Sequence, residues 1–175
     1  MRSGSGPAVC ARLPIVSHPS LGLPPPDMTA GLPDAAARLV AATGRVGARA
    51  LEIAIADDPT FRDRHDDLAL RRLLRDTEIY IDRLAKSLAS GDPSFAREWA
   101  DQVAPVYRRR AVSMDDMVRL SEGLRLAVKA VLAPGERPPV DQALDEAIAS
   151  FRRFRRIAGD ARPKNRLLQF LYKGA

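Results

Sequence analysis

The sequence predicts an all-α protein, a compact bundle of five or six helices. Apolar residues recur every three or four positions through most of residues 34–160, which is the spacing of one buried helix face. Short clusters of Gly, Pro, Asp and Ser separate these periodic stretches, as helix stop and start signals do. With 46% hydrophobic residues in 175, the chain can form one core, and we expect one helical domain at 34–160.

Residues 1–33 are predicted to be a disordered, proline-rich leader. They contain half of the 14 prolines of the chain, with Gly and Ser between them, so that no helix or strand of useful length fits. The apolar stretch 8–16 is too short and too interrupted for a secretory signal. An alternative interpretation takes Met28 as the true start of the protein.

The first helix is expected over 34–56. One face would carry Leu39, Val46, Ala50 and Ile53. Two glycines three residues apart, at 44 and 47, either weaken this helix or let a neighbouring helix approach closely. Asp58-Pro59 then restarts the chain in a short turn through Phe61.

A helical hairpin is predicted from Asp67 to about Arg110. Its first arm carries an apolar stripe formed by Leu70, Leu74, Ile81, Leu84 and Leu88. Gly91 supplies a left-handed C-cap, Asp92 accepts from the first turn of the second arm, and Pro93 needs no N–H there.

The second arm is expected to bury Trp99 on a face that also includes Phe95, Val103 and Val106. Pro105 should kink or end this arm because it removes one backbone hydrogen bond. We interpret the arginines at 108–110 as a solvated face.

Two more helices follow. Ser113 caps the first, with Asp116 in a capping-box-like position. Its buried stripe would consist of Met117, Val118, Leu124, Val128, Val131 and Leu132. Pro138-Pro139 opens the last helix, and Gly159 ends it. The inward positions of this helix would be Val140, Leu144, Ala147, Ile148, Phe151 and either Phe154 or Ile157.

Residues 70–132, with the central stretch SLASGDPSFAREWADQVAPVYRRRAVSMDDM, resemble the helical N-terminal domain of RsbR-type stress-response regulators. The resemblance lies in the apolar positions and helix starts of about a third of the chain. It departs at Ala111, where we expect a glycine. It implies a globin-like sensory or scaffolding module without a haem, of a kind that an output domain follows.

The net charge of +6 is concentrated at the C-terminal end. Residues 150–175 hold eight Lys and Arg side chains against one Asp, so the rest of the chain is close to neutral. Residues 161–175 form a basic, amphipathic segment that would dock on the bundle, on a partner or on a membrane surface. The candidate interaction residues are Arg152, Arg153, Arg155, Arg156, Lys164, Arg166, Leu168, Phe170, Leu171 and Tyr172.

The sequence contains no recognisable catalytic or metal-binding motif. His18 lies in the leader, and we interpret His65, beside two aspartates, as a surface residue rather than a ligand. There is no glycine-rich phosphate loop and no nucleophile with a nearby base. We therefore expect a protein that is not an enzyme and needs no cofactor. A single cysteine, Cys10, fits a cytoplasmic location.

Two classes of function remain after these observations. The first is a non-enzymatic regulatory or sensory module that assembles with copies of itself and with other regulatory proteins. The alternative is a nucleic-acid-binding or peripheral membrane protein that uses the basic C-terminal end. We expect the intact chain to be a dimer or larger, because the apolar side chains of 167–172 need a cover.

Overall fold

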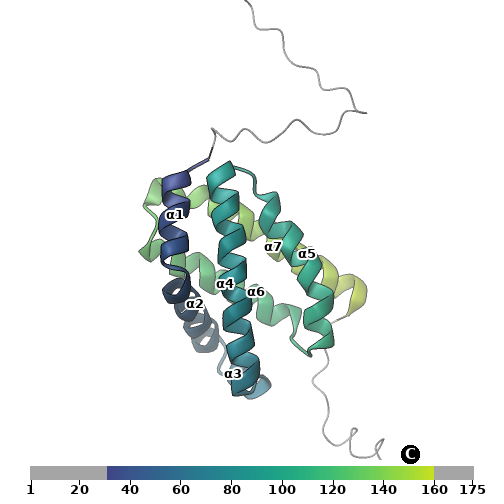
Figure 1. Ribbon diagram of the computed structural model, residues 1–175. Coiled ribbons are helices and arrows are strands. Elements are labelled where there is room, and N and C mark those ends of the chain that lie inside the picture. Colours follow the sequence, from purple (N-terminus) through teal and green to yellow (C-terminus); the bar gives the residue numbers. More distant parts are fainter. Residues whose placement is uncertain (1–30, 160–175) are drawn as a thin grey trace, which may run out of the picture.

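The computed structural model describes residues 31–159, and within them every regular element is a helix (Figure 1). The predicted all-α fold class is confirmed. The leader up to residue 30 and the segment from residue 160 lie outside the described residues. The elements are α1 (Pro33–Ala41), α2 (Thr43–Asp57), α3 (Thr60–Arg64), α4 (Asp67–Ser90), α5 (Ser94–Arg109), α6 (Met114–Ala127), the 3₁₀ turns η2 (Val128–Ala130) and η3 (Pro134–Glu136), and α7 (Arg137–Ala158).

Helix α4 is the central element, and its ends are set by the signals expected from the sequence. It is 24 residues long and packs against α1, α2, α5 and α7. The side chain of Asp66 accepts a hydrogen bond from the N–H of Ala69 at 2.7 Å, which caps its start. Gly91 ends it in the left-handed conformation with φ 72°. Asp92 then accepts from the N–H of Ser94 at 2.9 Å, as predicted.

The helices are arranged around α4 as Figure 1 shows, with α1 and α2 on one side, α5 on the other, and α6 and α7 behind. Helix α2 packs on α6, and α7 packs on both α5 and α6. The solvent side of α4 is consequently left uncovered by any other described helix (Figure 1).

An aromatic cluster fills the centre of the core. The rings of Tyr80 and Trp99 stack with their centroids 4.3 Å apart, and the edges of Tyr107 and Phe151 face the same indole. Trp99 is only 6% exposed, which confirms the prediction that it is buried. The hydroxyl of Tyr80 pairs with Ser121 at 3.2 Å, so this end of the cluster is satisfied.

The expectation of one helix over 34–56 is wrong, because the chain breaks at Ala42 into α1 and α2. Ala42 has φ −101° and ψ 6°, outside the helical region, and the hydroxyl of Thr43 donates to the carbonyl of Val40. The two pieces have different partners, since α1 packs on α4 and α2 packs mainly on α6. The apolar periodicity of the sequence continues across Ala42, but the packing of α1 and α2 on different helices breaks the helix there.

The close helix contact that we considered for Gly44 and Gly47 occurs instead at Gly123. A Cβ added at Gly123 would lie 2.4 Å from the carbonyl oxygen of Ala50, so α6 touches the backbone of α2 there. Gly44 has open space around it, and Gly47 has only ordinary side-chain contacts. Gly123 is thus the glycine that sets the distance between α2 and α6.

The buried face of α5 is rotated from the predicted one. Trp99 is buried as expected, but Phe95, Val103 and Val106 are only partly buried. The small residues Ala96, Ala100 and Ala104 and the aromatic Tyr107 are buried in their place. Helix α5 packs against both α4 and α7, and alanines lie where the helices approach each other most closely. A prediction that relies on large apolar residues does not identify such a face.

The structure also decides three smaller points about helix ends and faces. Of the two alternatives at Pro105, a kink or an end, the end is excluded, since α5 continues to Arg109. The helix that begins after Ser113 ends at Ala127, and a 3₁₀ turn follows it. Of the two alternatives at the end of α7, Phe154 packs on the core, whereas Ile157 is 80% exposed.

Residues 31–33, which the sequence analysis assigned to the leader, contact the helices. The N–H of Leu32 donates to the carbonyl of Leu88 at 2.7 Å, and α1 already begins at Pro33. A Cβ on Gly31 would overlap the backbone of Ala89, so this residue too is set against α4. Residues 31–33 therefore already belong to the helical domain.

Candidate functional site

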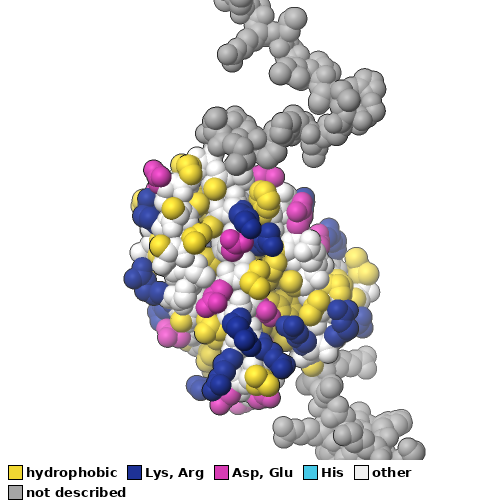
Figure 2. Space-filling model, in the orientation of Figure 1, with side chains coloured by type: hydrophobic (Ala, Val, Ile, Leu, Met, Phe, Trp, Pro, Cys, Tyr) yellow, Lys and Arg dark blue, Asp and Glu magenta, His cyan; other side chains and the backbone are white. Residues whose placement is uncertain are grey.

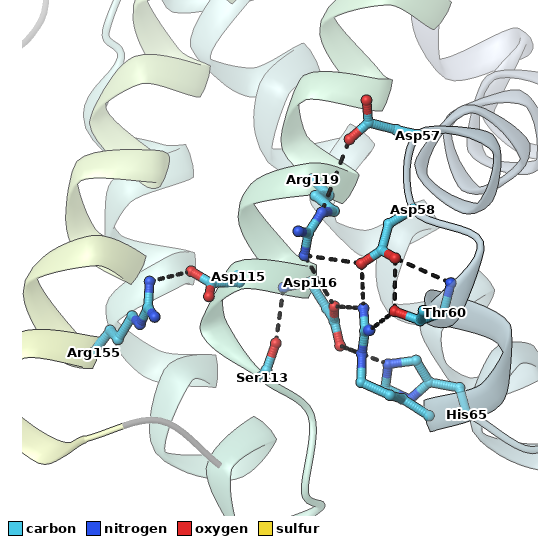
Figure 3. Close-up of polar contacts among 10 residues, drawn as sticks. Asp57, Asp58, Thr60, His65, Ser113, Asp115, Asp116, Arg119 and Arg155 are labelled. Atoms are coloured by element: carbon cyan, nitrogen blue, oxygen red, sulfur yellow. Dashed lines mark hydrogen bonds and ion pairs between the residues drawn. The ribbon is translucent and has the colours of Figure 1, made fainter. Parts of the chain in front are cut away.

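A buried carboxylate, Asp116, joins the start of α6 to α3. Its N–H donates to the Oγ of Ser113 at 3.0 Å, which confirms the predicted N-cap. Its side chain does not complete a capping box but points toward α3, where Oδ2 pairs with Nε2 of His65 at 2.9 Å (Figure 3). Arg64 donates to Oδ1 of the same carboxylate at 2.6 Å. Asp116 is 1% exposed, so these bonds replace its hydration.

The cluster extends outward through Asp58, which accepts from Arg64 at 2.8 Å and from both the N–H and the hydroxyl of Thr60. Arg119 of α6 reaches the same carboxylate at 3.3 Å (Figure 3). The hydrogen bond from the Thr60 hydroxyl, followed by that from Arg64, lowers the pKa of Asp58 to about 2. Burial alone would raise the pKa of Asp116, but the hydrogen bonds from His65 and Arg64 outweigh it and lower this pKa.

Our interpretation of His65 as a surface residue is wrong. The residue is 5% exposed, its ring lies 4.9 Å from that of Phe61, and its Nε2 faces Asp116. Its two acidic neighbours in sequence form the start of α4, with Asp66 as the N-cap and Asp67 as the first helical residue. Both oxygens of Asp116 are paired with side chains at the end of α3. The cluster therefore acts as a structural joint between α3 and α6.

A second polar feature is a surface that we call the α4–α5 arginine face. It consists of Arg71, Arg72, Arg75, Arg108, Arg109 and Arg110. Figure 2 shows Lys and Arg side chains gathered over the lower half of α4 and the adjoining end of α5. Only Arg110 of the six forms an ion pair within residues 31–159, with Asp76 at 3.1 Å. Elsewhere on the domain many arginines, such as Arg38 and Arg125, are held by carboxylates.

Two exposed apolar residues flank these arginines on the same side of α4. Leu68 is 52% exposed and Ile79 is 48% exposed. At about 100° per residue, positions 68, 72, 75 and 79 fall on one narrow stripe of the helix. The solvent side of α4 therefore combines unpaired positive charge with uncovered apolar surface.

A small cavity opens where this face meets the core. It has a volume of about 40 Å³ and lies between Arg72 and Asp76 of α4 and Tyr107 and Arg110 at the end of α5. Tyr107 is 2% exposed, and its hydroxyl has no hydrogen-bond partner among the described residues. Burial, followed by the charge of Asp76, raises the pKa of Tyr107. Asp76 is thus near enough to act on the hydroxyl but does not form a hydrogen bond of normal geometry with it.

The candidate interaction residues of α7 divide into two kinds. Arg153 pairs with Asp101 at 2.6 Å, and Arg155 pairs with Asp115 at 2.5 Å, so both are held against the domain. Arg152 and Arg156 are exposed and have no ion pair within the described residues. The other candidates, Lys164, Arg166, Leu168, Phe170, Leu171 and Tyr172, lie outside the described residues.

Sequence reasoning missed the cavity and the joint for one reason. Each brings together residues far apart in the chain, 51 positions for His65 and Asp116. Tyr107 carried a usable signal, because it lies eight residues after Trp99 and so returns close to the same helix face.

Comparison with protein-family models, with curated proteins and with solved structures finds no match to this chain. Within residues 31–159 no three His, Cys, Asp or Glu side chains converge in a way that would hold a metal ion. None of the helices described is long and apolar enough to cross a bilayer.

Proposed function

We propose that this chain is a non-enzymatic regulatory or sensory module of the cytoplasm that works by assembling with copies of itself and with other regulatory proteins. The observation that carries the proposal is the solvent side of α4. Five arginines of the adjoining α4–α5 arginine face, three of them on α4, have no ion pair within the described residues, and two apolar side chains of α4, Leu68 and Ile79, are about half exposed. A surface of this kind gains free energy when a partner covers it.

The chemistry of the face also specifies the partner surface. Arginine heads remain in water at little cost, but they attract carboxylates, and their stems add to the apolar contact area. The partner surface would therefore offer acidic side chains around one or two apolar positions. The resemblance to RsbR-type regulators supports the same class of function, since that family works through assembly.

The test is the mass of the full chain in solution, measured by light scattering for paired variants. Leu68→Ser lies on the face, and Leu126→Ser on α6 is the matched control because its exposure, 48%, is nearly the same. We expect Leu68→Ser to shift the chain toward monomer and Leu126→Ser to leave the mass unchanged. Equal masses for all three proteins, with the parent a dimer or larger, would exclude this face as the contact.

A second candidate contact is the basic C-terminal segment, for which the exposed and unpaired Arg152 and Arg156 are the supporting observation. Deleting residues 164–175 distinguishes it from the α4 face, because a monomer would then form with α4 intact. If the segment instead serves a nucleic acid or an anionic membrane, binding to that partner should fall steeply with salt.

A further inference from the structure

The cavity below the α4–α5 arginine face has an excess of hydrogen-bond donors. The hydroxyl of Tyr107 is a buried donor that forms no hydrogen bond of normal geometry within the described residues, although the carboxylate of Asp76 is near it, and burial raises its pKa. Arg110 uses one of its five N–H groups on Asp76, and Arg72 has no hydrogen bond within residues 31–159. Asp76 is the single carboxylate that lines the cavity, and it already accepts from Arg110.

The shape of the cavity limits what can enter it. A volume of about 40 Å³ is enough for one water or for an oxygen or two of a larger group. Leu73 and Val112 form apolar walls, so the less exposed polar groups of the lining are Tyr107 and the carboxylate of Asp76. At the mouth, the guanidinium groups of Arg72 and Arg110 are at the surface, where they can contact whatever part of that group stays outside.

We propose that this cavity binds a phosphate group, with one oxygen inside on Tyr107 and the others at the mouth on Arg72 and Arg110. Phosphate offers several acceptor oxygens, which suit the three donors Tyr107, Arg72 and Arg110. The carboxylate in the lining already accepts from Arg110, and guanidinium groups match the geometry of phosphate oxygens. A water molecule would satisfy Tyr107 but would leave the guanidinium of Arg72 without an anion, since Arg110 alone pairs with Asp76. Arg75, Arg108 and Arg109 nearby add positive charge that favours approach of the anion.

This inference does not depend on the assembly proposed above, because it concerns a small anion and one molecule of the protein. The phosphate proposal and the assembly proposal can therefore fail independently of each other. Leu68→Ser should bind phosphate as the parent does, while its mass changes. A parent that binds no phosphate would leave the assembly proposal intact.

The test is calorimetric titration of the full chain with inorganic phosphate, against sodium chloride of the same ionic strength. Tyr107→Phe removes only the buried hydroxyl, and the control Tyr80→Phe removes an equally buried hydroxyl that pairs with Ser121 and does not line the cavity. A hydrogen bond to a charged group predicts that Tyr107→Phe raises the dissociation constant about ten-fold. We expect Tyr80→Phe to leave it unchanged.

A surface pair of variants keeps the proposal testable if a core variant folds poorly. Arg72→Gln lines the cavity and should weaken phosphate binding, whereas the adjacent Arg71→Gln does not line it and should bind as the parent. The proposal is overturned if the parent shows no binding beyond that of chloride, or if Arg71→Gln and Arg72→Gln weaken binding equally. The latter result would mean general attraction by the arginine face.

Two further binding measurements identify the kind of molecule that carries the phosphate group. Tyr107-dependent binding of O-phosphoserine would identify an ester on a small molecule or protein. Tyr107-dependent binding to vesicles that contain phosphatidate, and not to phosphatidylcholine alone, would identify a lipid headgroup. Either result supports the proposed site. The proposal is contradicted if the Tyr107→Phe variant binds as the parent does in all of these measurements.

Discussion

The carboxylate of Asp116 and the ring of His65 meet at 2.9 Å across 51 residues of sequence, and both are almost fully buried. This contact, together with the ion pair from Arg64, joins the short helix α3 to α6. Removing the carboxylate leaves the buried histidine ring without its acceptor and the guanidinium of Arg64 with Asp58 as its remaining carboxylate partner. The joint should therefore contribute substantially to the stability of the domain.

We expect Asp116→Ala to lower the free energy of unfolding by about 3 kcal/mol, the low end for a broken buried pair because Arg64 keeps some contact with water. The matched control is Asp115→Ala, which removes the neighbouring carboxylate in the same helical turn. Asp115 is 39% exposed and pairs with Arg155 at the surface, so the loss should stay below about 1 kcal/mol. Urea unfolding measures both, and equal losses would contradict the structural role of the joint.

The joint should also make the domain sensitive to acid. The pKa of Asp58 is lowered to about 2 and that of Asp116 is lowered as well, so the unfolded chain binds more protons than the folded one below about pH 4. Their contribution is complete above the unfolded pKa and is lost as the pH falls through the folded pKa. Urea midpoints should drop between about pH 4 and pH 2, and Asp58→Asn should flatten that drop. An unchanged slope in Asp58→Asn would contradict the assignment.

Two glycine-to-alanine substitutions should have opposite effects on stability. Gly123→Ala forces a Cβ to 2.4 Å from the carbonyl of Ala50, and we expect a loss of about 1–3 kcal/mol from overpacking. Gly44→Ala meets nothing within 4 Å in a helix, so it should gain about 0.5–1 kcal/mol. Thermal unfolding of the two variants checks the close contact between α2 and α6, which a gain in both would exclude.

The single tryptophan reports on the aromatic core. Trp99 is 6% exposed and stacks on Tyr80, so its emission should be blue-shifted and poorly quenched by iodide. Trp99→Ala should cost about 3–5 kcal/mol, as expected for loss of a large buried ring. An emission maximum like that of indole in water, in a folded protein, would contradict the packing of α5.

The sequence predicted the parts of the fold that depend on local signals. The caps at Ser113, Gly91 and Gly159 act within one turn of the chain, and each is found where the residue type suggested. Buried faces that consist of large apolar residues were also predicted well, as for Leu144 and Phe151 of α7. The break at Ala42 has no such signal, because it arises from the different partners of α1 and α2.

The candidate site was less predictable. The interaction residues chosen from the sequence lie at the basic end, whereas the cavity combines Arg72 with Tyr107 and Arg110 from another helix. The run 108–110 was visible, but only the antiparallel packing of α4 on α5 brings it beside the arginines of α4. Whether an arginine is paired also depends on tertiary contacts, which is why Arg153 and Arg156 differ while being close in sequence.

The mass of the intact chain in dilute solution tests the central proposal of assembly most directly. We expect light scattering in moderate salt to give at least twice the 19.1 kDa of one chain, and we expect this mass to fall when Leu68 is changed to Ser. A parent chain that remains at 19.1 kDa at every concentration, with the same mass in the Leu68→Ser variant, would contradict self-assembly through α4.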